Sequence, residues 1–139
     1  MTIDDHIKYL NDTVLCTLKP SSIHGIGVFA LKDIKKDDNL YCTASESPMW
    51  YKLPLNRLKD LRPEVLALIL DRWPQITEGR PFKSPNDDAN LMSFMNHSDS
   101  PNSCEGLAIR DIKAGEEITE DYNTGNLSEL QKEHYRFLK

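Results

Sequence analysis

Residues 90–102, NLMSFMNHSDSPN, place an Asn-His pair directly behind an apolar run. A polar side chain left unpaired beside a core costs about 1–3 kcal/mol, so Asn96 and His97 need partners in the backbone or in a ligand. Asn offers a donor and an acceptor, and a neutral His offers one of each, so together they could read the edge of a heterocycle. The residues alone leave two interpretations open, a turn anchor and a ligand site.

Residues 24–30, HGIGVFA, match the dinucleotide-binding pattern G-x-G-x-x-A. That pattern requires a helix after the glycines, whereas Val28 to Leu31 read as another strand, so a nucleotide-binding fold is not expected. Two interpretations remain. The glycines form the turn of a hairpin, or they leave the backbone bare of side chains so that a ligand can lie against it.

Residues 115–123, GEEITEDYN, put Tyr122 at the end of a strand that starts at Glu117. Tyr122 is either a half-buried aromatic or a phenol that orients or polarises a reacting group. No serine-nucleophile motif is present, and His6, His24 and His134 have no His or Cys three or four positions later. The sequence therefore predicts no catalytic metal.

The elements around these motifs are expected to be mostly β with two or so helices. PEVLALILDRW, from residue 63 to 73, has a broad apolar face and is followed by Pro74, so it predicts a helix. A second helix is expected over 126–139. Short β segments are expected at VLCTL, GVFAL and NLYCT.

An internal repeat links the two ends of the chain. Residues 30–40, ALKDIKKDDNL, align without gaps on residues 108–118, AIRDIKAGEEI. Each copy is predicted to form a strand, a charged turn and a second strand. Gly115 suits the turn of the second copy, and Asp37 must adopt the same conformation in the first. Two such units suggest small sheets that face one another.

Length, charge and cysteine content limit the function classes. The 139 residues predict one domain, and no apolar run approaches the ~20 residues of a membrane span. The net charge of −5 argues against nucleic acid as a direct ligand and suits a Lys- or Arg-rich partner. Cys16, Cys42 and Cys104 are widely spaced, which predicts buried thiols in a reducing, intracellular setting.

Taken together and in order, HGIGVFALKDI, FMNHSDSPN and RDIKAGEEITEDY resemble the SET domain of protein lysine methyltransferases. The similarity covers roughly residues 14–123 of what we expect to be a single SET domain over 1–139, with the helix at 126–139 as a lid. The resemblance implies small β-sheets and a pseudoknot at the active site, where the N-H-S segment and the closing segment pass through one another. Such threading is rare among folds.

The resemblance also implies a cofactor, S-adenosyl-L-methionine, and no metal. His24, Gly25, Ile26 and Gly27 would lie along the cofactor through their backbone. Asn96 and His97 would meet it as well, so the pair would be satisfied by a ligand. The implied catalytic residues are Tyr122, which also contacts the cofactor, and Tyr41, which lines the lysine channel.

Three departures from the family pattern limit what carries over. Asp99 stands where a cysteine often follows the N-H-S, no cysteine-rich segment follows Tyr122, and the Gly-Glu expected after Tyr41 is missing. We therefore expect Tyr135 or Phe137, on the C-terminal helix, to complete the cofactor and lysine sites.

The leading hypothesis is a protein lysine N-methyltransferase that acts on a basic protein, such as a histone or a histone-like protein. The alternative within the family is a degenerate SET domain that binds a peptide or partner without methylating it. Outside the family, a small β-rich interaction domain would bind no S-adenosylmethionine. Neither nucleic acid nor membrane is expected as a partner, and unshielded sheet edges would suit a homodimer. We expect a stand-alone protein of a bacterium, phage or virus, located in the bacterial cytoplasm or, in a eukaryotic host, in the nucleus.

Overall fold

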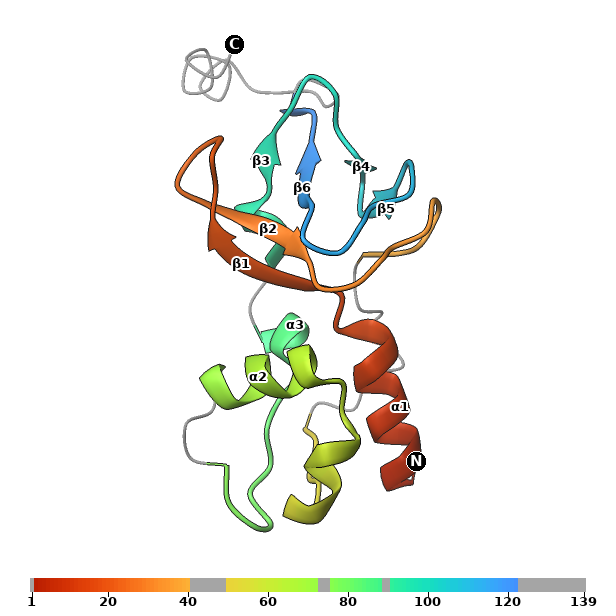
Figure 1. The fold of residues 1–139 in the computed structure, drawn as a ribbon, viewed down its shortest axis with the longest axis vertical. Coiled ribbons are helices and arrows are strands. Elements are labelled where there is room, and N and C mark those ends of the chain that lie inside the picture. Colours follow the sequence, from red (N-terminus) through yellow and green to blue (C-terminus); the bar gives the residue numbers. More distant parts are fainter. Residues whose placement is uncertain (1, 41–49, 73–75, 89–90, 123–139) are drawn as a thin grey trace.

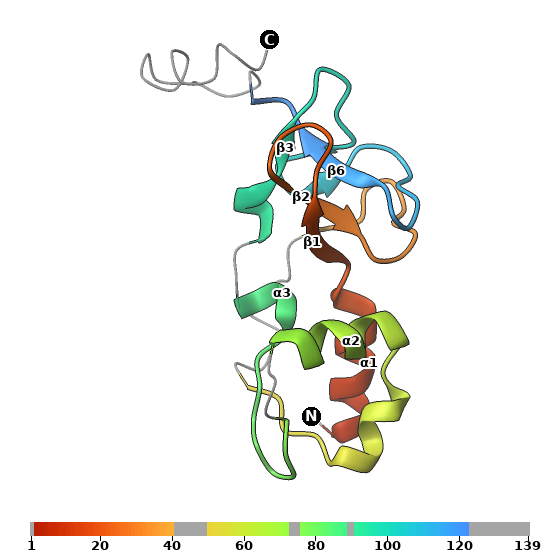
Figure 2. The ribbon, with the colours of Figure 1, turned by 60° about the vertical axis from the view of Figure 1, so that its left-hand side comes forward.

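The computed structural model describes residues 2–40, 50–72, 76–88 and 91–122. These residues form two parts, with the strands and the short helix η2 (Leu91–Phe94) gathered at one end and the other helices at the other (Figures 1 and 2). None of the helices in the described ranges is long and apolar enough to cross a membrane. Tyr41, Cys42, the lid helix at 126–139 and its aromatic residues lie outside the described residues.

The helical part combines α1 (Ile3–Thr13), η1 (Leu55–Asp60), α2 (Pro63–Arg72) and α3 (Pro85–Asp88). The predicted helix that begins at Pro63 is confirmed as α2. Helix α1 was not predicted, although Thr2 and Asp5 form a capping box at its start. Helices α1, η1 and α2 pack with the segments around them in one apolar cluster, the helical core: Ile7, Leu10, Val14, Tyr51, Leu53, Leu58, Leu61, Val65, Ile69 and Phe82.

The strand part contains a four-stranded sheet with the order β1-β2-β6-β3 and a two-stranded sheet of β4 and β5. Strands β1/β2 and β2/β6 are antiparallel, whereas β3 and β6 are parallel. The bounds are β1 Cys16–Pro20, β2 Ile26–Ala30, β3 Asn96–His97, β4 Ser103–Cys104, β5 Leu107–Ala108 and β6 Glu117–Glu120. The predicted mixture of small β-sheets with a few helices is confirmed.

A second apolar cluster, the sheet core, lies among these strands: Leu15, Cys16, Val28, Ala30, Ile34, Leu40, Leu91, Met95, Ala108, Ile112 and Ile118. The prediction of buried thiols holds for Cys16 and is wrong for Cys104, which is exposed. Cys104 belongs to a two-residue strand of the small sheet, in which Ser103 takes the buried face and Cys104 the solvent face.

The internal repeat has a structural counterpart. Ile34 and Ile112, which are equivalent in the alignment, exchange both backbone hydrogen bonds, at 2.7 and 2.8 Å. Asp37 and Gly115 both have positive φ, 74° and 87°, as predicted from the turn chemistry. The two copies pair with each other about a local two-fold relation. Some predicted strands shrink to single bridging residues, because each copy completes the other's hydrogen bonds instead of extending its own.

The two parts are joined through Asn86 of α3. Its Oδ1 accepts from the backbone N–H of Leu15 at 3.0 Å and of Cys16 at 3.2 Å, and its Nδ2 donates to the Cys16 carbonyl at 2.9 Å. The side chain thereby substitutes for a neighbouring strand where β1 begins. The helical part is anchored in this way to the sheet that carries the candidate site.

Candidate active site

The three sequence motifs meet on adjacent strands. Strand β6, from the closing motif, pairs with both β2, which follows the glycine turn, and β3, which holds the Asn-His pair (Figure 1). The Cα partners are Val28 with Ile118 and Asn96 with Thr119. Segments that are about 70 residues apart along the chain therefore form one continuous surface.

The Asn96 side chain holds the glycine turn against β6. Its Nδ2 lies 3.0 Å from the His24 carbonyl, 3.3 Å from the Ile26 carbonyl and 3.0 Å from Oε2 of Glu117. The amide nitrogen of Asn96 therefore has its partners in the protein, and the contact of the pair with a cofactor stays a prediction. These protein partners are within reach because the turn folds back over β6 and presents its carbonyl oxygens at hydrogen-bonding distance.

Glu117 is the centre of this contact, although its motif did not predict a role for it in the site. Ser21 Oγ donates to both carboxylate oxygens, at 2.7 and 3.0 Å, while Asn96 donates from the other side. A Cβ at Gly27 would stand 2.5 Å from Oε2 of Glu117. A side chain at position 27 would have to displace the Glu117 carboxylate from Ser21 and Asn96, so this packing favours glycine independently of any ligand. The sequence did contain a signal for this role, because Glu117 directly precedes Ile118, which is fully buried, so its carboxylate needs partners near the core.

His97 connects β3 to Tyr122. The Tyr122 backbone N–H donates to Nδ1 of His97 at 3.1 Å, so Nδ1 must be the unprotonated nitrogen. Nε2 then carries the hydrogen and donates to Asp99 at 3.0 Å. A further carboxylate oxygen, Oδ1 of Asp121, lies 3.7 Å from Nδ1. Asp99, at the position where the family often has a cysteine, thus selects the tautomer of His97 that can hold Tyr122.

The Tyr122 phenol is fixed at both ends. Its hydroxyl donates to the Met95 carbonyl at 2.5 Å, and its ring packs against the His97 ring with a centroid distance of 5.3 Å. A phenol that donates its hydrogen can still accept one, so its oxygen can orient an amine. The side chain is half-buried, which places the phenol at the boundary between the sheet core and solvent.

Asn102 and Ser103 hold the opposite side of β6. Asn102 Oδ1 accepts from the Thr119 N–H at 2.9 Å, and its Nδ2 donates to the Glu117 carbonyl at 2.8 Å and to Glu116 at 3.1 Å. Ser103 Oγ donates to the Thr119 carbonyl at 2.8 Å. The final Asn of FMNHSDSPN is therefore a structural partner of β6, a role that spacing alone does not reveal.

Two carboxyl groups near the site have shifted pKa values. Burial acts to raise the pKa of Glu116, but hydrogen bonds from Asn102 and the Lys113 N–H, together with Arg110, outweigh it and lower that pKa. Burial raises the pKa of Glu120, and no opposing contribution is present. The carboxylate of Glu116 is thus stabilised by its neighbours, whereas that of Glu120 is not.

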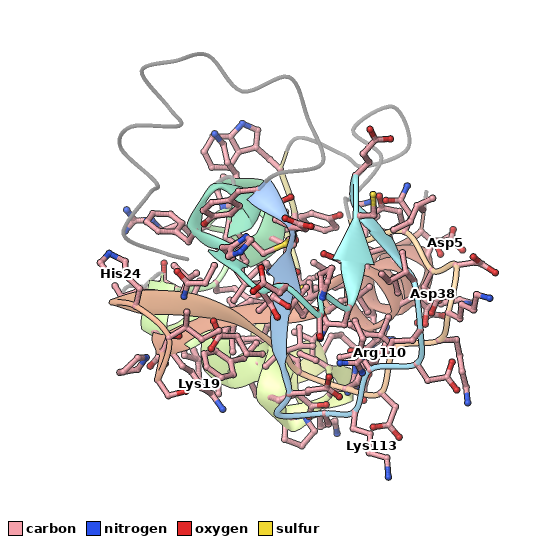
Figure 3. The ribbon with its side chains drawn as sticks, turned by 90° about the horizontal axis from the view of Figure 1, so that it is seen from above. Asp5, Lys19, His24, Asp38, Arg110 and Lys113 are labelled. Atoms are coloured by element: carbon pink, nitrogen blue, oxygen red, sulfur yellow. The ribbon has the colours of Figure 1, made fainter. Side chains whose placement is uncertain are left out.

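The remaining predicted residues divide into two groups. His24, Gly25 and Ile26 form the exposed turn between β1 and β2, where His24 projects outward (Figure 3). Tyr41, Tyr135 and Phe137 lie outside the described residues, so their assigned roles stay predictions.

A family model of the SET domain matches residues 25–123. The chain belongs to the SET-domain family. The matched stretch contains β2, β3, β6 and Tyr122, which is the whole surface described above apart from the start of the turn. Members of this family are generally protein lysine methyltransferases that use S-adenosylmethionine.

Among solved structures, this SET domain is similar to a crystal structure from Plasmodium falciparum, of a protein provisionally assigned as a histone methyltransferase. The two sequences are 20% identical, the match covers 80% of this chain and 95% of that chain, and the TM-score is 0.38. The search of curated proteins found no match.

Proposed function

We propose that this protein is an S-adenosylmethionine-dependent lysine N-methyltransferase that acts on a basic protein substrate. The observation that carries the proposal is the position of Tyr122. Its hydroxyl is held on the Met95 carbonyl and its backbone on His97, at the junction of the three family motifs. A phenol fixed in this way can aim the lone pair of a lysine amine.

The turn between β1 and β2 fits the implied cofactor. Gly25 has φ +48°, and apart from its two chain neighbours none of the described residues has an atom within 4 Å of the place where its Cβ would stand. The backbone there is open on one side, while Asn96 fixes the carbonyls of His24 and Ile26 on the other. The backbone of residues 24–27 and of the Asn96-His97 pair would hold the cofactor, which supplies an electrophilic methyl group on a sulfonium centre when it is bound.

Residues of the chain prepare the amine. A lysine ammonium has an ordinary pKa of about 10.4 and must lose its proton before its nitrogen can attack. The phenol is held on the backbone of Met95, a residue of the sheet core, and an apolar environment of this kind disfavours the charged form. Tyr122 positions the resulting neutral amine, and the Met95 carbonyl prevents the phenol from rotating away.

The net charge of −5 supports a basic substrate, such as a histone or a histone-like protein, because opposite charge speeds encounter. The charge alone does not choose among basic proteins. We therefore expect labelling of several Lys-rich proteins, with the best acceptor defined by sequence around the target lysine.

The test is transfer of labelled methyl from S-adenosylmethionine to core histones and to a crude lysate. We expect Tyr122→Phe to lower lysine labelling at least about ten-fold, in line with the usual worth of a positioned catalytic group. Tyr9→Phe, in helix α1 of the helical part, is the matched control and should leave labelling unchanged. Calorimetry should detect cofactor binding by the wild type and by both variants.

The outcomes separate the competing functions. Cofactor binding without methyl transfer to any protein would favour the non-catalytic binding module. Absence of both cofactor binding and transfer would refute the proposal. Equal labelling by wild type and Tyr122→Phe would refute the role of the tyrosine while leaving the activity standing.

A further inference from the structure

Glu120, the last residue of β6, is a carboxylate without a partner. It is half-buried, and within the described ranges its side chain makes no hydrogen bond or ion pair. The neighbouring carboxylates are engaged: Glu117 by Ser21 and Asn96, Glu116 by Asn102 and Arg110, and Asp99 by Nε2 of His97, while Asp121 has a partner as well. A carboxylate that loses water without gaining a partner destabilises the fold, so its place calls for an explanation.

The strand register puts Glu120 on the same face as His97. The two residues are Cα partners in the parallel pair of β3 and β6, and side chains at paired positions share a face. The opposite face is identified independently, since Asn96 and Glu117 are hydrogen-bonded there. Because the His97 ring packs on the Tyr122 ring, the face that carries Glu120 is also the face of the phenol.

That face combines apolar and ionisable side chains, and no Lys or Arg of the described residues contributes to the pKa of Glu120. Ile118, two residues before Glu120, is fully buried, and Met95, whose carbonyl holds Tyr122, is nearly so. The ionisable groups around Glu120 are His97 on β3, Asp99 on the following loop, and Asp121 and Tyr122 beyond β6. A ligand with a positive charge and an aliphatic stem would match both the carboxylate and the apolar neighbours.

We propose that Glu120 binds the ammonium group of the substrate lysine and accepts its proton. One N–H bond of the ammonium breaks, an O–H bond forms on the Glu120 carboxylate, and the nitrogen keeps its electron pair as a neutral amine facing Tyr122. After methyl transfer the product leaves as a methylammonium ion, and Glu120 releases its proton to solvent. This role rests on the proposed function and adds the proton acceptor that the function requires.

The rise in the pKa of Glu120 that burial causes is consistent with this role. A carboxyl group that binds its proton more tightly is a stronger base toward an ammonium ion. The same desolvation strengthens the attraction between the carboxylate and the incoming cation.

Glu120→Gln keeps the shape of the side chain but can neither pair with a cation nor accept its proton. At pH about 7.5 we expect kcat/KM for histone methylation to fall at least about ten-fold, with the deficit shrinking toward pH 9.5 as solution deprotonates more lysine. This pH range lies above the ordinary titration of carboxyl and imidazole groups and below that of a phenol. Glu105→Gln, at an exposed turn between β4 and β5, is the control and should follow the wild type.

A ligand assay tests the site without turnover. Millimolar n-butylammonium should raise the melting temperature of the wild type and of Glu105→Gln, whereas n-butanol should not. Glu120→Gln should lose the response to n-butylammonium.

The results separate the two proposals. An active wild type whose pH profile runs parallel to that of Glu120→Gln would overturn the role of Glu120. An inactive wild type would count against the proposed function, and the n-butylammonium response would then decide whether Glu120 binds alkylammonium ions. Loss of that response only in Glu120→Gln supports the assignment, and an equal response in all variants refutes it.

Discussion

Asn102→Ala is the substitution whose cost can be worked most directly from the structure. Asn102 is 1% exposed, and its amide serves the backbone of β6 as a neighbouring strand would. Truncation leaves the Thr119 N–H and the Glu117 carbonyl without that partner. At about 1–3 kcal/mol for each buried group left unpaired, the free energy of unfolding should fall by roughly 4 kcal/mol.

The assay is urea unfolding followed by tryptophan fluorescence and circular dichroism, with melting temperature as a second readout. Roughly 3–5 °C of melting temperature per kcal/mol is expected for a chain of this length, so a drop of more than about 10 °C should be seen. Asn56→Ala, at an exposed position of η1, is the control and should stay within about 0.5 kcal/mol of the wild type.

Asn102→Asp provides an internal check on the geometry. It keeps the acceptor for the Thr119 N–H but turns an oxygen toward the Glu117 carbonyl and the Glu116 carboxylate. It should be at least as destabilising as Asn102→Ala at neutral pH and recover partly in acid, where a protonated carboxyl can donate. If Asn102→Ala cost less than about 1 kcal/mol, the amide would not be supporting β6 and the reasoning would be refuted.

Two further predictions concern ionisable groups. Because burial raises the pKa of Glu120 in the folded state, stability is lost as the pH rises through that pKa. Glu120→Gln should therefore have a higher melting temperature than the wild type near neutral pH, and this difference should vanish in acid. The same difference in melting temperature at all pH values would contradict this prediction. Burial also raises the pKa of the Cys16 thiol to about 12. In the native protein at pH 8, Cys16 should therefore resist alkylation by iodoacetamide, whereas the exposed Cys104 should react. Peptide mapping that found both cysteines modified equally in the native protein would show that Cys16 is not buried.

Much of the fold could be predicted because the signals are local. Apolar periodicity and Pro63 defined α2, and the repeat predicted that Asp37 and Gly115 would share a turn conformation. Helix α1 also carried a local signal, the Thr2 and Asp5 capping box followed by Ile7 and Leu10 at helical spacing. That helix was missed although its signal was present.

The hydrogen-bond partners of the site residues could not be predicted, because they come from distant parts of the chain. Asn96 donates to the carbonyl of His24, 72 positions away, and its acceptors are fixed by how the turn folds over β6. Residue type showed that Asn96 and His97 needed partners, and it left protein and ligand open as the source. The structure supplies protein partners for the Asn96 amide nitrogen and for both ring nitrogens of His97, while the contact of this segment with a cofactor stays a prediction.

The sequence by itself determined the family, the motif order and the identity of Tyr122 as the phenol of interest, because those features are carried by residue types and spacing. Only the tertiary structure decided that Glu117 is fully engaged while Glu120, three residues later, is not. In an extended strand these two side chains point to opposite faces. Which face gains hydrogen-bond partners depends on the strands that pack beside it, and these come from distant parts of the chain.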